Sequence, residues 1–462
     1  MRDFLASSIG VACTAALVIP LSVPASASAV TAAFVDDPAP PGSTQSVPLV
    51  PLGTERAAAA VQQGLARRDV KPFSLVGVVW DDPHDELHGT VQVRTRATGT
   101  TDWSDWQNVE THNHEHAADP GTPEGDAGAV RGSTAPLWVG DSDGVELRVR
   151  AEAPRSGAST AALPRGLRAE LVDPGDDPVA AGAPSADDEP APGQDPAQGP
   201  EIPEGTEPDI AKGPVAGAAM TAEESASSAV NADLAAMGAL EIPELTKAET
   251  EAQLVGFSTP YVGPRPRIVT RKGWGADESL RARDFIYTTS VQAAFVHHSA
   301  TGNNYTCAEA PSVLRGIYRY HVQSSGWRDF GYNFAVDKCG NIYEGRAGGV
   351  AKAVMGAHTL GFNTNSMGIA VLGTYGSTAA PASALTAVAK LTAWKLGLYG
   401  KDPRAKTTLT SGGGNLYAKG KKVSLNTISG HRDGFATECP GALLYDKLGT
   451  ARTASAKYQG RP

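Results

Sequence analysis

The stretch Thr427-Ile-Ser-Gly-His-Arg-Asp-Gly-Phe-Ala-Thr-Glu-Cys-Pro-Gly-Ala-Leu443 places an imidazole and a thiol eight positions apart. The imidazole belongs to His431 and the thiol to Cys439, with Thr437 two residues before the thiol. A cysteine followed by Pro-Gly does not continue a strand, so we expect Cys439 to lie on a turn that closes back toward His431. The pair suits zinc far better than magnesium or calcium, which prefer oxygen ligands. Because a catalytic zinc normally has three protein ligands and one position open for water, we expect a third ligand elsewhere.

The length and charge of the chain limit its organisation. With 462 residues, the chain is too long for a single ordinary domain, and two or three domains are expected. Its 51 glycines and 33 prolines are concentrated in some stretches, which indicates folded blocks separated by linkers. The formal net charge of -10 argues against a nucleic-acid-binding protein, which would present a basic face.

Residues 1–29 have the features of an export signal. Residues 4–21 are apolar or small, and Ala25-Ser-Ala-Ser-Ala29 offers small-residue cleavage sites. A membrane anchor is the alternative, but the apolar run is interrupted by Ser7, Ser8, Thr14 and Pro20. We therefore expect a secreted protein with no stable membrane insertion once the signal is cleaved.

Three cysteines remain after cleavage, because Cys13 leaves with the signal: Cys307, Cys339 and Cys439. In an oxidising compartment, an odd count assigns one thiol to something other than a disulfide. If Cys439 binds a metal, Cys307 and Cys339 are free to form a disulfide.

Residues 30–173 are interpreted as a linker followed by an all-β domain. The linker, residues 30–70, is rich in Ala, Pro and Ser, with one short helix over residues 55–68. Over residues 71–173, apolar and polar side chains alternate, as in Val91-Gln-Val-Arg-Thr-Arg96. Such alternation is typical of strands with one buried face, and the turns between them predict a small antiparallel β-sandwich.

This domain contains three histidines at alternate positions, His112, His114 and His116. Their spacing suits a metal ion, but their polar and small neighbours are typical of a solvated loop. We therefore do not expect a biological metal site there.

Residues 174–263 are predicted to form a disordered acidic linker. They are rich in Asp, Glu, Pro, Ala and Gly, with a short helix over residues 221–240. A segment with so few large apolar side chains buries too little surface to offset the entropy of ordering.

Residues 264–462 have the size and composition of one globular domain. Strands are predicted at Ala294-Phe-Val-His-His-Ser299, at Gly331-Tyr-Asn-Phe-Ala-Val-Asp337 and at Met367-Gly-Ile-Ala-Val-Leu-Gly373. Helices are predicted over residues 310–323 and 383–398. Strands that alternate with helices predict an α/β (α+β) domain with a central mixed sheet flanked by helices.

The histidines of this domain include the candidates for the third ligand. His297 and His298 are adjacent in a strand, so their side chains point to opposite faces and at most one reaches a given site. His321 lies within a helical repeat, where a packed, hydrogen-bonded role is favoured. His358 lies among small residues that leave room for a ligand. Spacing alone does not decide whether His297 or His358 is the third ligand.

A series of motifs in residues 266–450 matches a known family: Arg271-Lys-Gly-Trp-Gly-Ala276, Phe295-Val-His-His-Ser-Ala300, Gly326-Trp-Arg-Asp-Phe-Gly-Tyr-Asn-Phe334, Ile342-Tyr-Glu-Gly-Arg346, Gly356-Ala-His358, Asn363-Thr-Asn-Ser366, Gly430-His-Arg-Asp433 and Thr437-Glu-Cys-Pro-Gly441. The stretch resembles the peptidoglycan recognition proteins and zinc amidases, which include the phage T7-type lysozyme-amidases. The resemblance implies that His297, His431 and Cys439 bind Zn²⁺. It also implies that Tyr332 and Thr437 occupy the catalytic positions of the family.

The resemblance further implies a substrate and a location. It implies hydrolysis of the amide between N-acetylmuramic acid and L-alanine in peptidoglycan, a substrate that the secreted protein expected from the export signal would meet at the cell wall. His358, Asn363 and Arg346 are the candidates for holding the muropeptide. A structural ion pair with Glu344 or Asp337 is the alternative for Arg346. A protein that binds peptidoglycan without cleaving it is the alternative function, although such members typically lack the cysteine ligand. Residues 401–423 exceed the compact family core and are expected to form an extra hairpin beside the site.

Overall fold

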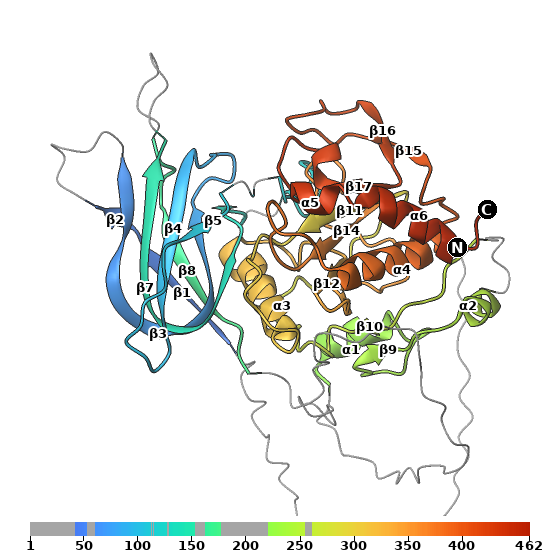
Figure 1. Ribbon diagram of the computed structural model, residues 1–462, viewed down its shortest axis with the longest axis horizontal. Coiled ribbons are helices and arrows are strands. Elements are labelled where there is room, and N and C mark those ends of the chain that lie inside the picture. The colour runs from blue at the N-terminus through green and yellow to red at the C-terminus, as the bar shows by residue number, and fades with distance from the viewer. Residues whose placement is uncertain are drawn as a thin grey trace, which may run out of the picture. The chain divides into compact units, whose positions relative to one another are not determined.

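The computed structural model describes residues 42–52, 61–111, 113, 115–126, 129–152, 162–176, 220–254 and 261–462. Residues 40–462 form one compact unit. Two sheets dominate this unit, one all-β and N-terminal, the other mixed and flanked by helices (Figure 1). The predicted fold class is therefore confirmed. The predicted export signal, residues 1–29, lies outside the described residues.

The N-terminal sheet has eight strands in the order β1-β8-β3-β7-β4-β5, with β2 and β6 also paired to β3. Their bounds are β1 (Ser43–Pro48), β2 (Val50–Pro51), β3 (Gln62–Trp80), β4 (Gly89–Ala97), β5 (Gln107–Val109), β6 (Gly132–Ser133), β7 (Leu137–Ala151) and β8 (Arg168–Asp173). All neighbouring strands are antiparallel. As predicted from the alternation, Val91, Val93 and Leu147 point into a common apolar core.

The predicted linker over residues 30–70 is wrong where the structure describes it. Residues 43–48 form β1, and residues 62–70 belong to β3 rather than to a helix. Gln62 to Leu65 pair with β7, and the side chain of Leu65 is buried in the core. Pairing with a distant strand therefore overrides the local helical preference of this stretch.

The C-terminal sheet has seven strands in the order β17-β11-β14-β12-β13-β10-β9. Their bounds are β9 (Glu241–Ile242), β10 (Ile268–Val269), β11 (Ala293–His298), β12 (Phe334–Val336), β13 (Ile342–Glu344), β14 (Ser366–Val371) and β17 (Ile428–Gly430). The pairs β11–β14, β11–β17, β12–β14 and β10–β13 are parallel, whereas β12–β13 and β9–β10 are antiparallel. The predicted mixed sheet is therefore confirmed.

Helices cover both faces of this sheet, and its five strands β11, β12, β13, β14 and β17 are buried at every residue. Helices α4 (Ala382–Leu398) and α6 (Leu448–Tyr458) contact one another (Figure 1). They share a core with Ile369 and Val371 of β14. Ala370 lies between these two residues and packs instead in the core that contains α3 (Ala310–Arg319). Such alternation places successive side chains of one strand on opposite faces. The short helix α5 (Ala442–Tyr445) precedes α6.

Helix α3 also contacts the N-terminal sheet. Its core contains Leu314 and Ile317 of the helix together with Leu75 and Trp138 of the other sheet. The π-helical turn η1 (Tyr320–Ser324) continues α3, and the Tyr320 hydroxyl donates to the carbonyl oxygen of Thr134 at 3.1 Å. The two sheets are therefore joined by a shared apolar core around α3.

The predicted linker over residues 174–263 is wrong for residues 220–254. They form α1 (Ala222–Ala229), β9 and α2 (Lys247–Gln253), and both helices begin with a capping box. Asn231 donates to Glu344 at 2.8 Å, and Ile242 is fully buried in the core of the C-terminal domain. A few well-placed contacts and caps order the segment although its composition is poor in large apolar residues. Residues 177–219 lie outside the described part of the chain.

The predicted extra hairpin is present, formed by β15 (Lys406–Thr410) and β16 (Lys422–Asn426). Its apolar side chains, Leu409 and Leu425 among them, pack against Phe295 of β11. The loop between its strands reaches the Cys439 turn, because Ala436 donates its amide to Asn415 at 2.9 Å.

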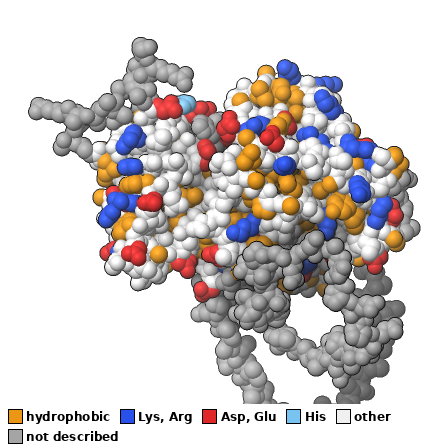
Figure 2. Space-filling view, in the orientation of Figure 1, with side chains coloured by type: hydrophobic (Ala, Val, Ile, Leu, Met, Phe, Trp, Pro, Cys, Tyr) orange, Lys and Arg blue, Asp and Glu red, His pale blue; other side chains and the backbone are white. Residues whose placement is uncertain are grey.

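No helix in the described part of the chain is both long enough and apolar enough to cross a membrane. On the face drawn in Figure 2, basic and acidic side chains are interspersed.

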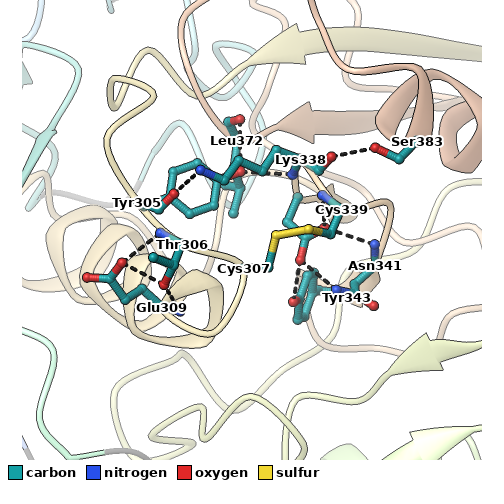
Figure 3. The surroundings of a disulfide bond; sticks show 11 residues. Tyr305, Thr306, Cys307, Glu309, Lys338, Cys339, Asn341, Tyr343, Leu372 and Ser383 are labelled. Atoms are coloured by element: carbon teal, nitrogen blue, oxygen red, sulfur yellow. Dashed lines mark hydrogen bonds between the residues drawn. A yellow bond between two sulfur atoms is a disulfide. The ribbon is translucent and has the colours of Figure 1, made fainter. Parts of the chain in front are cut away.

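Cys307 and Cys339 form the predicted disulfide (Figure 3). The bridge ties the segment before α3 to the turn between β12 and β13. Asp337 organises that turn, because its Oδ1 accepts the amide of Cys339 at 2.9 Å and its Oδ2 accepts the Tyr343 hydroxyl at 2.8 Å.

We expect replacement of both Cys307 and Cys339 by serine to lower the free energy of unfolding by about 3 to 4 kcal/mol. The physical reason is the 32-residue separation of the two cysteines, because the bridge restricts a loop of that length in the unfolded chain. Urea denaturation followed by tryptophan fluorescence measures the effect. Reduction of the wild-type protein should reproduce the same loss, and an unchanged midpoint in both cases would contradict the prediction.

Lys395 of α4 gives the stability of the domain a pH dependence. Its Nζ donates to the carbonyl oxygens of Lys352, at 2.6 Å, and of Val350. Burial lowers the pKa of Lys395 to about 7, and Glu344 acts in the opposite direction. Unfolded lysine has a pKa of about 10.4, so above pH 7 the unfolded chain binds more protons than the folded chain. Below pH 7, Lys395 is charged in both the folded and the unfolded chain, and it destabilises the fold to the full extent. Above pH 7, this destabilisation decreases, so the free energy of unfolding rises with pH.

Between pH 7 and pH 9, we expect the free energy of unfolding of the wild-type protein to increase by about 2 kcal/mol relative to that of Lys395→Met. Urea denaturation of both proteins at both pH values measures this difference. Lys390→Met is the matched control, because Lys390 lies on the same helix but is exposed. Parallel pH profiles for wild type and Lys395→Met would contradict the prediction.

Candidate metal centre

His297 comes from β11, a strand in which every residue is buried. Its imidazole lies 5.2 Å from the ring of Tyr332 and 4.6 Å from that of His431, between ring centres. The next residue, His298, accepts the amide of Tyr375 at 3.4 Å. The two adjacent histidines therefore have different surroundings, as expected for opposite faces of a strand.

His431 follows β17 directly and begins the 3₁₀ turn η2 (His431–Asp433). The Asp433 carboxylate fixes the start of this turn, since it accepts the amide of Gly430 at 2.9 Å and the hydroxyl of Tyr445 at 2.6 Å. A side chain at Gly430 would meet the Tyr445 ring at 2.6 Å, so glycine is required for this close approach.

Cys439 lies on the predicted turn that closes back toward His431. The amide of Arg432 donates to the carbonyl oxygen of Cys439 at 3.0 Å, which joins the two ends of the turn. The Cys439 amide donates to the Thr437 hydroxyl at 3.1 Å. The Cys439 thiol lies 3.7 Å from Nδ1 of His297.

Four side chains converge at this point: His297, His431, Cys439 and His116. All are buried, and their ligand atoms lie within 4.8 Å of one another. Nε2 of His116 lies 3.1 Å from Nδ1 of His431. Ligand atoms around a tetrahedral zinc are roughly 3.3–3.8 Å apart, so this set of nitrogen and sulfur donors fits a zinc ion after small adjustments.

Burial determines the charge state of these side chains in the absence of a cation. It lowers the pKa of both His116 and His297 well below the usual value, so both imidazoles are neutral. Burial likewise raises the pKa of the Cys439 thiol well above its usual value. A divalent cation would reverse the second effect, because it stabilises the thiolate.

The participation of His116 corrects the interpretation of residues 112–116 as part of a solvated loop. His116, Glu115 and Asp119 are each at most 5% exposed. His112 and His114 lie outside the described residues. The alternating histidines were a signal for metal binding, but the sequence does not indicate that their loop lies against the other domain.

Comparisons with known proteins find relatives of the C-terminal domain. The family model described as N-acetylmuramoyl-L-alanine amidase matches residues 287–442. Peptidoglycan-recognition protein SC2 of Drosophila simulans is 31% identical over 183 residues, which are 40% of this chain and 85% of that protein. The chain belongs to the family of peptidoglycan recognition proteins and N-acetylmuramoyl-L-alanine amidases.

The relatives within this family include both recognition proteins and an amidase. The human N-acetylmuramoyl-L-alanine amidase is 32% identical over 225 residues, which are 47% of this chain and 32% of that protein. Among solved structures, wild-type Drosophila PGRP-LB covers 40% of this chain and 93% of its own, with 26% identity and a TM-score of 0.32. The model described as Rv3811 N-terminal galactose-binding domain-like matches residues 28–182.

The two residues for which the resemblance implies a catalytic role, Tyr332 and Thr437, lie beside the candidate metal centre. Tyr332 is 4% exposed, and burial raises the pKa of its hydroxyl well above the usual value. The Thr437 hydroxyl donates to a carboxylate oxygen of Glu115 at 2.8 Å. A cleft lined by His116, His298, Thr437 and Cys439 adjoins these groups.

The structure places the three predicted substrate-binding residues in buried positions. His358 is fully buried, with Nδ1 2.9 Å from the Thr359 hydroxyl. Asn363 and Arg346 are bound instead by acidic side chains of the N-terminal domain, Asp119 and Glu124 respectively. Arg346 therefore does form an ion pair, but its partner is Glu124 and not the expected Glu344 or Asp337.

His321 is packed and hydrogen-bonded, as the sequence favours. Its Nδ1 accepts the amide of Gly331 at 3.2 Å, and its ring stacks on Trp327 at 4.4 Å. Burial lowers the pKa of His321 to about 3, so this imidazole is neutral.

Proposed function

We propose that the protein is a secreted, zinc-dependent N-acetylmuramoyl-L-alanine amidase that hydrolyses the amide between N-acetylmuramic acid and L-alanine in peptidoglycan. The observation that carries the proposal is the convergence of His297, His431 and Cys439 beside the Tyr332 ring. These three residues would hold the zinc ion. A zinc ion bound there supplies a Lewis acid for the amide carbonyl and lowers the pKa of water to roughly 7.

The protein supplies hydrogen-bond donors for the charge that develops on the carbonyl oxygen. Tyr332 keeps its proton because burial raises the pKa of its hydroxyl, so it serves as a donor throughout the pH range of the reaction. Thr437 supplies a second hydroxyl close to Cys439. The resemblance places Thr437 at a position where the family has lysine or threonine. Because Thr437 is neutral where a lysine would bring a positive charge, stabilisation of the oxyanion depends more strongly on the metal.

A non-catalytic peptidoglycan-binding protein is the alternative function. It is favoured by the names of several matched relatives, among them Peptidoglycan-recognition protein SC2 of Drosophila melanogaster, which is 31% identical over 183 residues. The cysteine at position 439 favours the enzyme, because the thiolate completes the set of three ligands.

Mass spectrometry of peptidoglycan digestion products tests the proposal. The zinc-loaded full chain should release stem peptides with a free L-alanine amine and leave glycan strands with intact lactyl groups. A chelator should prevent the release, and excess zinc should restore it. Retention of intact peptidoglycan with no stem peptide released, by metal-loaded His116→Ala as well as by the metal-loaded full chain, would favour the binding protein.

We expect Tyr332→Phe to lower the rate of amide hydrolysis by about 100- to 1,000-fold, the effect of removing one donor to an oxyanion. The affinity for zinc should be unchanged, because Tyr332 is not a ligand. Stem-peptide release and zinc titration measure the two quantities. Tyr287→Phe is the control, because Tyr287 is an exposed tyrosine of the same domain. A Tyr332→Phe protein as active as the control would contradict the proposed role.

A further inference from the structure

We propose that residues 115–126 of the N-terminal domain, here called the plug segment, hold the metal centre in a closed state. In this state His116 is the fourth protein ligand of the zinc ion, and acidic side chains of the plug segment cover the residues that would bind substrate. The inference rests on the proposed function for the role of the metal. It adds that the full chain is a latent form of the enzyme.

The position of His116 is that of a ligand. Its Nε2 faces Nδ1 of His431 at 3.1 Å, and the two ring centres are 4.5 Å apart. His116 also lies near His297, with ring centres 5.3 Å apart. Zinc sites with four protein ligands are closed, whereas catalytic sites keep one position for water or substrate. His116 therefore takes the position that hydrolysis requires to be open.

The residue before His116 engages the catalytic position. Glu115 is 2% exposed and accepts the Thr437 hydroxyl at 2.8 Å. Its backbone carbonyl accepts the amide of Leu360 at 2.9 Å. The Thr437 hydroxyl consequently donates to the plug segment in the closed state and not to a substrate.

Asp119 and Ala117 bind the loop that contains Asn363. Oδ1 of Asp119 accepts the amide of Gly361 at 2.6 Å and the Asn363 side chain at 2.9 Å. The Asn363 side chain also donates to the carbonyl oxygen of Ala117 at 2.8 Å. Both protons of this amide are therefore satisfied by the plug segment.

Glu124 binds Arg346 in the fork geometry of a carboxylate–guanidinium pair. Its two oxygens accept from the two terminal nitrogens of Arg346 at 2.9 and 3.1 Å, and both side chains are buried. The amide of Arg328 donates to the same carboxylate at 3.2 Å. Paired charged groups of this kind form strong, directional contacts.

These contacts have one chemical character. The plug segment presents carboxylate and carbonyl oxygens to donors on the amidase domain, and a stem peptide would present the same kinds of acceptor through its own amides and carboxylates. The segment therefore imitates the ligand at Asn363 and Arg346 while it closes the metal centre at His116. Opening requires the segment to leave, so that substrate replaces each of these acceptors.

The first test measures metal coordination. The full chain is loaded with Co²⁺ in place of zinc, and azide is titrated while the visible spectrum is recorded. Four protein ligands leave no position for azide, so the spectrum of the wild-type chain should not change, whereas that of His116→Ala should. The zinc affinity of His116→Ala should also fall by at least about tenfold. Azide binding to the wild-type chain as readily as to His116→Ala would overturn the proposal.

The matched control for this test is His88→Ala. His88 belongs to the same domain, and its side chain is 63% exposed. This variant should retain the spectrum, the azide response and the zinc affinity of the wild-type chain.

The second test measures stem-peptide release from peptidoglycan by the same proteins. If fewer than about one molecule in ten is open, His116→Ala should raise the rate at least about tenfold. Equal release by wild type and His116→Ala would overturn the closure and leave the amidase function standing. Absence of release by every variant, together with the expected azide response, would refute the amidase function and leave the four-ligand centre standing.

Glu124→Gln provides an independent variant that leaves all four metal-binding side chains intact. It removes the negative charge opposite Arg346 and should raise stem-peptide release several-fold, because the closed state loses one of its strong contacts. If His116→Ala fails to fold, Glu124→Gln replaces it in the test. The proposal would then be overturned if Glu124→Gln released stem peptides no faster than the wild-type chain.

Discussion

Cys439→Ser is expected to weaken zinc binding by about 3 kcal/mol or more, which corresponds to a hundredfold or greater loss of affinity. Of the four side chains that converge at the candidate metal centre, Cys439 alone offers sulfur, and a serine hydroxyl keeps its proton at neutral pH and binds zinc poorly. Competition with a chromogenic chelator measures the affinity. Amide hydrolysis should fall below detection in the full chain. It should also do so in the His116→Ala background, where the rate is otherwise expected to be higher.

The fold of Cys439→Ser provides the internal control. Cys439 is 2% exposed and forms no disulfide, so its replacement by a residue of similar size should leave the circular dichroism spectrum unchanged. Removal of zinc from wild-type protein by a chelator should reproduce the loss of activity. A Cys439→Ser protein that binds zinc as tightly as wild type would exclude the thiol from the centre.

Arg271→Met is expected to lower the free energy of unfolding by about 3 to 5 kcal/mol. The Arg271 side chain is 2% exposed and pairs with Glu278 at 2.6 Å and with Asp329 at 3.1 Å. Its guanidinium also lies 4.9 Å from the ring centre of Tyr318. Removal of the cation takes from Asp329 its Arg271 partner in a site from which water is excluded, whereas Glu278 keeps its pair with Arg281 at 2.5 Å. The lost charge compensation at Asp329 is the main cause of the loss. Urea denaturation measures the effect.

Arg267→Met is the matched control, because Arg267 pairs with Glu241 at the surface, where the arginine side chain is 51% exposed. Screening by water makes such a pair weak, so its loss should cost less than about 1 kcal/mol. Equal losses in the two variants would show that burial does not determine the strength of the Arg271 pairs.

The fold of the C-terminal domain was predictable because its strands and helices carry strong local patterns. The buried run that contains His297 and the turn at Cys439-Pro440 each follow from neighbouring residues. The spacing of the histidines left His297 and His358 open, however. The resemblance chose His297, and the structure brings that residue to Cys439 while His358 packs beside it.

The errors have a common cause in contacts between distant segments. Residues 62–65 pair with a strand more than eighty residues away, and Ile242 enters the core of another domain. The residues next to these segments in the sequence do not indicate either contact. His116 was missed for the same reason, because its loop looks solvated until the amidase domain covers it.

The apolar core that α3 shares with the N-terminal sheet has a practical consequence for isolation of the C-terminal domain. A recombinant fragment that starts at residue 220 would lose Leu75 and Trp138, which now shield Leu314 and Ile317 from water. Such a fragment would expose an apolar patch on α3 and should self-associate or precipitate on expression. Expression of the full chain with the substitution His116→Ala is therefore expected to give a better-behaved preparation than the fragment.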